Sequence, residues 1–255
     1  MTATITGKPT SKQRRRFMRN AVAGAALSGG VRSAMAQPVA IGASATRSSA
    51  PAVAAANTAA PIVPAGYAFL RPAEADFVEA LVDHMVPADE LTGSGTALGL
   101  NQYFDRTLGG AWGDGAGLYL EGPWHAGTPA QGYQLPLTPA ELFRVGTDAL
   151  RSYCSGHFGK PFASLDAQQK ETLLHALNDG QVVLEGCPDT KRYFALLHQL
   201  VNEGLFADPL YGGNVGKAGW RLVGFPGVIA EHEKDVRIYR NSPYSAPVLS
   251  IGDAS

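Results

Sequence analysis

The sequence predicts a mainly α-helical protein with a single compact helical domain that is interrupted by two long loops rich in glycine and aromatic residues. Apolar residues recur at helical spacing in several segments, and helix-capping signals precede some of them. Alternating strand patterns are scarce, and neither a βαβ rhythm nor an internal repeat is visible. With 255 residues, of which 45% are hydrophobic, the chain can bury a sizeable core.

Two helices are predicted before residue 110. Pro72 occupies a first-turn position with acidic residues behind it, and apolar side chains recur at helical spacing until Pro87 ends the run. A second, shorter helix is expected from about Leu98 to Leu108.

Three further helices are predicted in the second half of the chain. Thr138 and Glu141 form a capping box, which indicates a helix from there to about residue 157. A weaker capping box precedes a second helix, predicted within 166–180, and a glycine is expected to end that helix. The last helix is expected over about 190–204.

The first 36 residues have the pattern of an export signal. They contain seven of the 21 Lys and Arg residues and none of the 22 Asp and Glu residues. A basic stretch is followed by a weakly apolar run over 21–27 and by the small-residue site Ala34-Met35-Ala36. We expect a signal peptide over 1–36 that is cleaved after Ala36. The alternative is a basic amphipathic helix that binds a membrane or RNA.

The basic stretch resembles a twin-arginine signal. Arg14 and Arg15 form the pair and Phe17 follows, although Gln13 departs from the usual Ser or Thr. The resemblance implies transport of a protein that has already folded in the cytoplasm. Such cargo usually holds a cofactor or a partner, so the chain either binds a cofactor or escorts a protein that does.

The charge that remains after residue 36 restricts the class of partner. This part of the chain carries 14 basic and 22 acidic residues, a net charge of −8. An acidic protein is a poor ligand for nucleic acid or an anionic membrane surface. No stretch approaches the roughly 18 to 20 apolar residues that a membrane-spanning helix needs.

Composition also sets the expected boundaries. Residues 37–66 are rich in Ala, Pro and Ser and carry almost no large apolar side chain, so we expect a disordered linker there. The helical domain is expected over 67–240 and a tail over 241–255.

Two loops are the strongest functional candidates. The first, over 108–137, has eight glycines and three prolines, and the second lies over 204–227. Large aromatic side chains on a glycine-rich backbone favour a surface for docking a partner, and the alternative is that individual rings fold back onto the core. The eight candidate interface residues are Trp112, Tyr119, Trp124, Tyr133, Phe206, Tyr211, Trp220 and Phe225.

Standard catalytic and cofactor motifs fail at specific positions. Residues 212–218 resemble a phosphate loop, but Tyr211 stands at its first glycine position and Ala218 replaces the hydroxyl residue. Residues 113–118 lack the third glycine of a dinucleotide fingerprint, and His232 lacks the second histidine of a zinc-protease helix. We therefore expect no catalytic, cofactor-binding or metal-binding residue on this chain.

The two cysteines, Cys154 and Cys187, would meet an oxidising compartment after export. Either the two cysteines form a disulfide with each other, which would stabilise the fold by roughly 3 to 4 kcal/mol in the chain-entropy model, or one of them forms a disulfide with a partner protein. The sequence leaves both arrangements open. A self-sufficient exported enzyme that uses Cys154 or a pair of histidines is the competing functional hypothesis.

The two loops contain sequence segments that resemble the small subunit (subunit 3, or γ) of gluconate 2-dehydrogenase. The resemblance covers roughly residues 70–230. These segments are Glu121-Gly122-Pro123-Trp124, residues 127–134, residues 136–144, residues 203–214 (which begin Glu203-Gly204-Leu205-Phe206), Gly219-Trp220, and Gly224-Phe225-Pro226-Gly227.

The resemblance implies a three-part periplasmic enzyme that is associated with the membrane. In such complexes an FAD-containing large subunit oxidises the sugar acid, and a multihaem cytochrome c subunit anchors it and passes electrons to quinone. The small subunit holds no cofactor, stabilises the flavoprotein, and escorts it through the twin-arginine translocase. This implies a heterotrimer with FAD and haem c on the partners.

Two alternatives stay open at this point. Related complexes oxidise glucose, fructose, sorbitol or 2-ketogluconate, and substrate selectivity belongs to the large subunit. A stand-alone periplasmic adaptor module would also fit a docking surface without a reactive centre.

Overall fold

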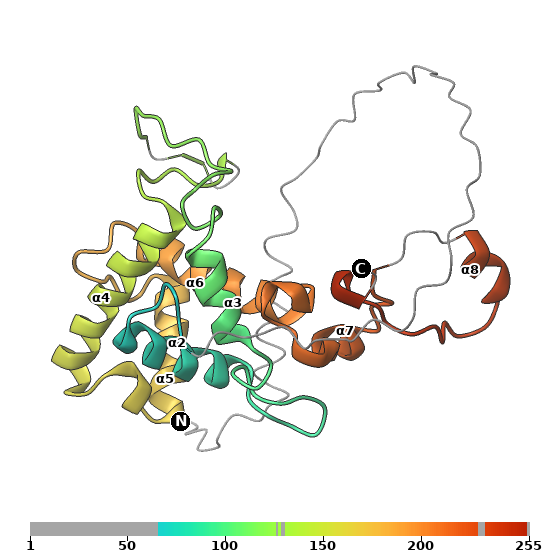
Figure 1. Ribbon diagram of the computed structural model, residues 1–255. Coiled ribbons are helices and arrows are strands. Elements are labelled where there is room, and N and C mark those ends of the chain that lie inside the picture. The colour runs from blue at the N-terminus through green and yellow to red at the C-terminus, as the bar shows by residue number, and fades with distance from the viewer. Residues whose placement is uncertain (1–65, 126, 129–130, 229–232, 254–255) are drawn as a thin grey trace, which may run out of the picture.

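The computed structural model describes residues 66–125, 127–128, 131–228 and 233–253. The predicted signal peptide, with Arg14, Arg15, Phe17, Ala34 and Ala36, lies outside these residues, as does nearly all of the predicted linker. The described part is mainly helical, as the sequence predicts, and its β-structure is a single bridge. The α-helices are α2 (Pro72–Met85), α3 (Leu100–Leu108), α4 (Pro139–Phe158), α5 (Ala167–Asp179), α6 (Thr190–Phe206), α7 (Ala218–Val223) and α8 (Glu233–Ile238) (Figure 1).

The five helices expected from the sequence all form, with small shifts at their ends. Thr138 accepts a hydrogen bond from the backbone of Glu141 and begins α4, and an equivalent capping box begins α5. Helix α3 begins at Leu100 rather than Leu98, because Gly99 adopts a left-handed conformation before it. Helix α6 continues two residues beyond Gly204. Sequence patterns place the helices well and their last turns less well.

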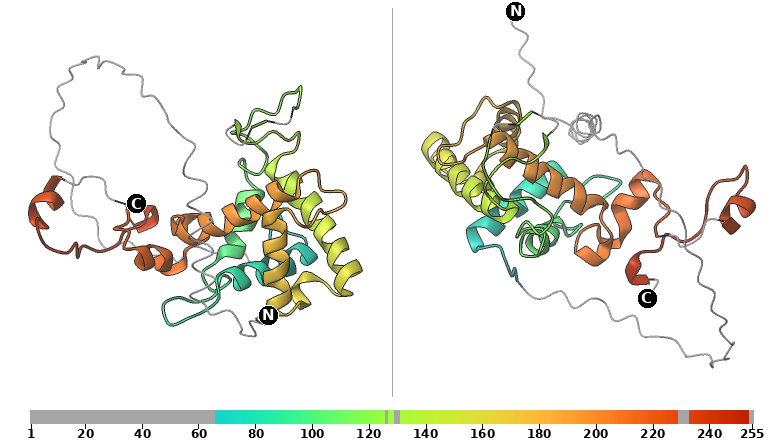
Figure 2. Two further views of the ribbon diagram at one scale, coloured as in Figure 1. Left: turned by 180° about the vertical axis from the view of Figure 1, so that it is seen from behind. Right: turned by 90° about the horizontal axis from the view of Figure 1, so that it is seen from above.

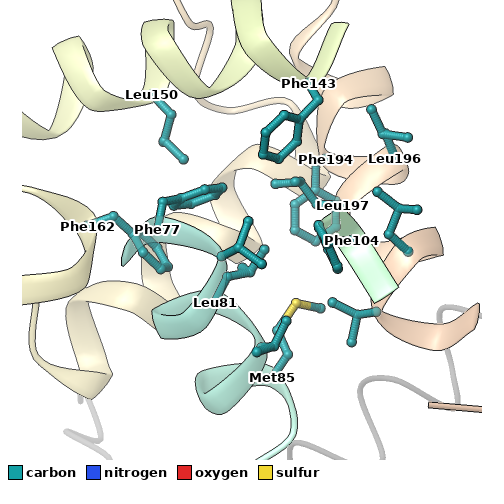
Figure 3. Close-up of a cluster of buried hydrophobic side chains, with 14 of the residues drawn as sticks. Phe77, Leu81, Met85, Phe104, Phe143, Leu150, Phe162, Phe194, Leu196 and Leu197 are labelled. Carbon is teal, nitrogen blue, oxygen red and sulfur yellow. The ribbon is translucent and has the colours of Figure 1, made fainter. Parts of the chain in front are cut away.

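Helix α6 is the centre of the domain. It packs against α3, α4, α5 and α7, and α2 packs against α3 and the short 3₁₀ helix η2 (Phe162–Ser164). Apolar side chains from these elements meet in one core, which Figure 3 shows in close-up. Its labelled members are Phe77, Leu81, Met85, Phe104, Phe143, Leu150, Phe162, Phe194, Leu196 and Leu197.

The crossing of α4 and α6 depends on a glycine. A Cβ atom on Gly146 would lie 2.2 Å from the ring of Tyr193, which is fully buried. The Tyr193 hydroxyl lies 3.0 Å from Oγ1 of Thr147, also on α4, so the buried phenol has a hydrogen-bond partner. The Tyr193 side chain therefore bridges the two helices where they lie close together. A larger residue at position 146 would push the helices apart.

The start of the domain is fixed to α3 by Asp105. Its buried carboxylate accepts three backbone hydrogen bonds of 2.8 to 2.9 Å, from the N–H groups of Ala68, Phe69 and Leu70. The guanidinium of Arg144 lies 4.2 Å above the Phe69 ring and donates to the Phe69 carbonyl. Charge-assisted bonds of this kind are stronger than neutral ones, so the first described residues are held firmly on the core.

The second loop is more structured than the sequence predicts. It contains the 3₁₀ helices η3 (Pro209–Tyr211) and η4 (Val215–Lys217), followed by α7. These elements lie beside the C-terminal end of α6 (Figure 2). Asn214 holds them together, because its amide donates to the Ala207 carbonyl and accepts from the Gly219 N–H, each at 2.8 Å.

The tail returns to the domain rather than leaving it at residue 240. Gly227 pairs with Leu249 in the bridge, and Val228 donates to the Leu249 carbonyl at 2.8 Å. The N–H of Ile251, in the 3₁₀ helix η5 (Ile251–Asp253), donates to Asp208 at 2.8 Å. The predicted boundary between domain and tail therefore does not separate the two in the structure.

Gly146→Ala should lower the free energy of unfolding by about 2 kcal/mol or more, because the new methyl group would displace Tyr193. Gly156→Ala is the matched control on the same helix, where nothing lies within 4 Å of the added Cβ. There the change should stabilise the protein by about 0.5 to 1 kcal/mol. Urea denaturation of the purified chain measures both, and equal effects would contradict the close α4–α6 contact.

Asp105→Asn should lower the free energy of unfolding by about 3 kcal/mol, since it removes a charge that accepts three backbone hydrogen bonds. Asp76→Asn, at an exposed position on α2, should change it by less than about 0.5 kcal/mol. Thermal denaturation of the two variants tests the difference. A loss for Asp105→Asn as small as that of the control would show that Asp105 does not anchor the start of the domain.

Candidate functional site: a groove beside Trp112

The loop that follows α3 forms a tight series of turns and presents Trp112. A Cβ on Gly113 would lie 1.9 Å from the Leu108 carbonyl oxygen, so the loop can follow α3 this closely only with glycine there. The Gly113 carbonyl accepts from the N–H of Ala140, which ties the loop to the start of α4. The side chain of Trp112, which this loop carries, is 38% exposed.

Trp112 lines two hollows, one on either side of it. A hollow of about 490 Å³ is lined by residues of α3, α6, η3 and the loop: Tyr103, Arg106, Thr107, Gly110, Ala111, Trp112, Glu203, Leu210 and Tyr211. A second, of about 350 Å³, is lined by Trp112, Gly117, Leu118, Tyr133, Pro139, Arg192, Ala195, Leu196 and Gln199. Together they form what we call the Trp112 groove.

Helix α6 forms one wall of both hollows. Arg192, Leu196, Gln199 and Glu203 recur every three or four residues, so they share one side of the helix. The groove thus follows the side of α6 opposite to much of its packed surface. The loop of residues 109–118 forms the other wall.

Three hydrogen bonds define the polar edges of the groove. The Tyr103 hydroxyl donates to Glu203 at 3.2 Å, and the Tyr133 hydroxyl donates to the Leu137 carbonyl at 2.6 Å. Arg192 donates to the Gly132 carbonyl at 2.5 Å. Burial raises the pKa of Tyr103 to about 12, with a further contribution from Glu203, and burial raises the pKa of Tyr133 to about 12. Both phenols therefore remain protonated donors at neutral pH.

The predicted interface residues divide into groups. Trp112, Tyr133 and Tyr211 line the groove, and Tyr133 also packs against the core. Tyr119 is 78% exposed, whereas Trp124 is half-buried.

Phe206 and Phe225 are exposed beside Trp220, outside the residues that line the groove. Trp220 itself is 5% exposed, and its Nε1 donates to the Phe206 carbonyl at 2.7 Å. Trp220 therefore belongs to the interior, and its assignment as an interface anchor is wrong. The burial follows from a close contact at Gly219, where a Cβ would lie 1.9 Å from the Leu205 carbonyl oxygen.

The sequence interpretation missed the charged lining of the groove. Arg106, Arg192 and Glu203 were not among its candidates, although the spacing of Arg192 and Glu203 on α6 places them on one side of that helix. Arg106 enters the groove because Leu210, in η3, lies close to α3, and this contact between distant segments left no pattern in the sequence.

Cys154 and Cys187 are free thiols in the structure, and a disulfide between them after export stays a prediction. Both are buried, with exposed fractions of 0% and 9%. Burial raises the pKa of Cys154 to about 11 and also raises the pKa of Cys187. A bond from either sulfur to a partner would need the surrounding residues to open, since the thiols face their own chain.

The described residues contain no group of three or more His, Cys, Asp or Glu side chains placed to hold a metal ion. His84 contacts Glu171 at 2.9 Å, and burial lowers the pKa of His198. Within the same described ranges, no helix is both long and apolar enough to cross a membrane.

Fold and site together define a mainly α-helical domain that carries an open surface groove with aromatic and charged walls. A family model described as gluconate 2-dehydrogenase subunit 3 matches residues 72–227, which is more than half of the chain. The protein therefore belongs to the gluconate 2-dehydrogenase subunit 3 family, a family of subunits of an oxidoreductase complex. A search of the curated proteins and a search of the solved structures each found no match.

Trp220→Ala should lower the free energy of unfolding by about 3 to 5 kcal/mol, because it removes a buried ring and its hydrogen bond. Trp112→Ala should cost about 1 kcal/mol, since that ring is only partly covered. Chemical denaturation of the two variants measures the difference. A larger loss for Trp112→Ala than for Trp220→Ala would contradict the assignment of one ring to the core and the other to the surface.

Proposed function

We propose that this chain is the non-catalytic small subunit of a periplasmic, membrane-associated gluconate 2-dehydrogenase-like complex. In this proposal it binds and stabilises an FAD-containing large subunit and escorts it through twin-arginine export. A multihaem cytochrome c subunit anchors the heterotrimer and passes electrons to quinone, and this chain holds no cofactor. The family match over residues 72–227 carries the proposal.

The aromatic residues of the Trp112 groove support the proposed escort role. A complex that persists for minutes, with ordinary association rates, requires a dissociation constant near the nanomolar range, or about −12 kcal/mol. Interfaces of this strength usually bury about 1,600 Å² in total and have aromatic residues at their centre. Trp112 and Tyr211 are exposed on a shared hollow and fit that role.

The export signal supports the same role. Arg14 and Arg15 resemble a twin-arginine pair, and this pathway suits a folded flavoprotein that has no signal of its own. The large subunit determines which substrate the complex oxidises. On the basis of the family, we propose that this substrate is gluconate.

Replacing Arg14 and Arg15 together by Lys should leave both this chain and the flavoprotein in the cytoplasm, and should abolish periplasmic dehydrogenase activity. Arg16→Lys with Arg19→Lys is the matched control outside the pair and should export both proteins. Cell fractionation with flavin absorbance measures the outcome.

Two results would contradict the proposed function. One is a flavoprotein that reaches the periplasm normally without the arginine pair. The other is a purified mature chain that carries flavin or haem, or that oxidises gluconate on its own.

A further inference from the structure

The Trp112 groove has the dimensions of a site for a protein segment. Arg192 and Glu203 are eleven residues apart on α6, so at 1.5 Å per residue the lining extends about 16 Å along the helix. An extended chain of about five residues has that length. The two hollows are open surface features, whereas small-molecule sites enclose most of their ligand.

The apolar part of the groove lies at its middle. Trp112 stands between the hollows, Leu118 and Leu196 line one of them, and Leu210 and Tyr211 line the other. Leu210 and Tyr211 are each 54% exposed. An exposed tryptophan flanked by apolar side chains is the usual composition of an interface centre.

Two arginines flank this apolar middle, one in each hollow. Arg106 donates to the Leu210 carbonyl and Arg192 to the Gly132 carbonyl, and neither forms an ion pair with a described residue. The single acid in the lining, Glu203, already accepts hydrogen bonds from Tyr103 and Gln199. The groove is therefore locally basic in a mature chain whose net charge is −8.

We propose that the Trp112 groove binds a surface segment of the flavoprotein large subunit that carries apolar side chains for the two hollows and carboxylates for Arg106 and Arg192. This inference rests on the proposed function and adds the place of contact and the chemistry of the partner segment. Charge complementarity selects this occupant over a second copy of the chain. In a symmetric dimer through this groove, the same basic patch would face itself.

The charge test uses two double variants with the same change in net charge. Arg106→Glu with Arg192→Glu reverses both groove charges, and Arg151→Glu with Arg237→Glu reverses two exposed charges outside it. Each variant is co-expressed with a differently tagged wild-type chain and the large subunit. The purified flavoprotein complex then reports how the two chains compete, without a need for the isolated large subunit.

The groove variant should be about 30-fold under-represented in the complex, while the control variant should compete within about twofold of the wild type. Trp112→Ala should also be about 30-fold under-represented. Dissociation of the wild-type complex should accelerate between about 0.05 and 0.5 M salt because the groove pairs are screened, and the groove variant should lose that dependence. Circular dichroism and thermal denaturation confirm that each variant is folded.

Equal competition by the groove variants in a complex that still forms would overturn this inference and leave the proposed function intact. Failure of the wild-type chain to co-purify with the flavoprotein would overturn both. Self-association of the free chain that is lost on Trp112→Ala would assign the groove to a second copy. A change in Trp112 fluorescence on deletion of residues 37–65 would assign it to this chain's own N-terminal segment. Either of those last two results would overturn the inference.

Discussion

The close approach of neighbouring segments to α6 is the constraint on which the rest of the structure depends. Gly146 lets α4 meet the Tyr193 ring, and Gly219 brings α7 against the end of α6. Gly213 also lies close to α6, because a Cβ on Gly213 would be 2.2 Å from the carbonyl oxygen of Gly204. Each contact leaves no room for a side chain, so the glycines determine how the elements stack around one helix.

This stacking also determines where the Trp112 groove lies. Because the core and the short helices cover much of α6, the row from Arg192 to Glu203 remains available to line the Trp112 groove. Helix α3 links that surface to the start of the domain. It carries Asp105, which holds residues 68–70, and the adjacent Arg106, which lines the groove. Residues 68–70, near the start of the domain, and the groove thus both depend on the same short helix.

Much of the fold could be predicted because its signals are local. The capping box at Thr138 and the glycine stop after α5 act within a few residues, and the structure confirms both. The burial of Trp220 and the return of the tail to Gly227 depend on contacts between segments that are distant in sequence. The groove itself was not predicted. Trp112, Tyr133 and Tyr211 stand out as aromatic residues in glycine-rich loops, but Arg106 and Arg192 come to lie beside them only through the tertiary arrangement.

Hydrogen–deuterium exchange of this chain, alone and in the purified complex, tests the central claim most directly. If the chain works by holding the flavoprotein through the Trp112 groove, amides of residues 109–118 and 209–212 should exchange more slowly in the complex. The exposed segment 233–246 should change little, and it serves as an internal reference. Unchanged exchange around Trp112, with slowing confined to other parts of the domain, would contradict the account.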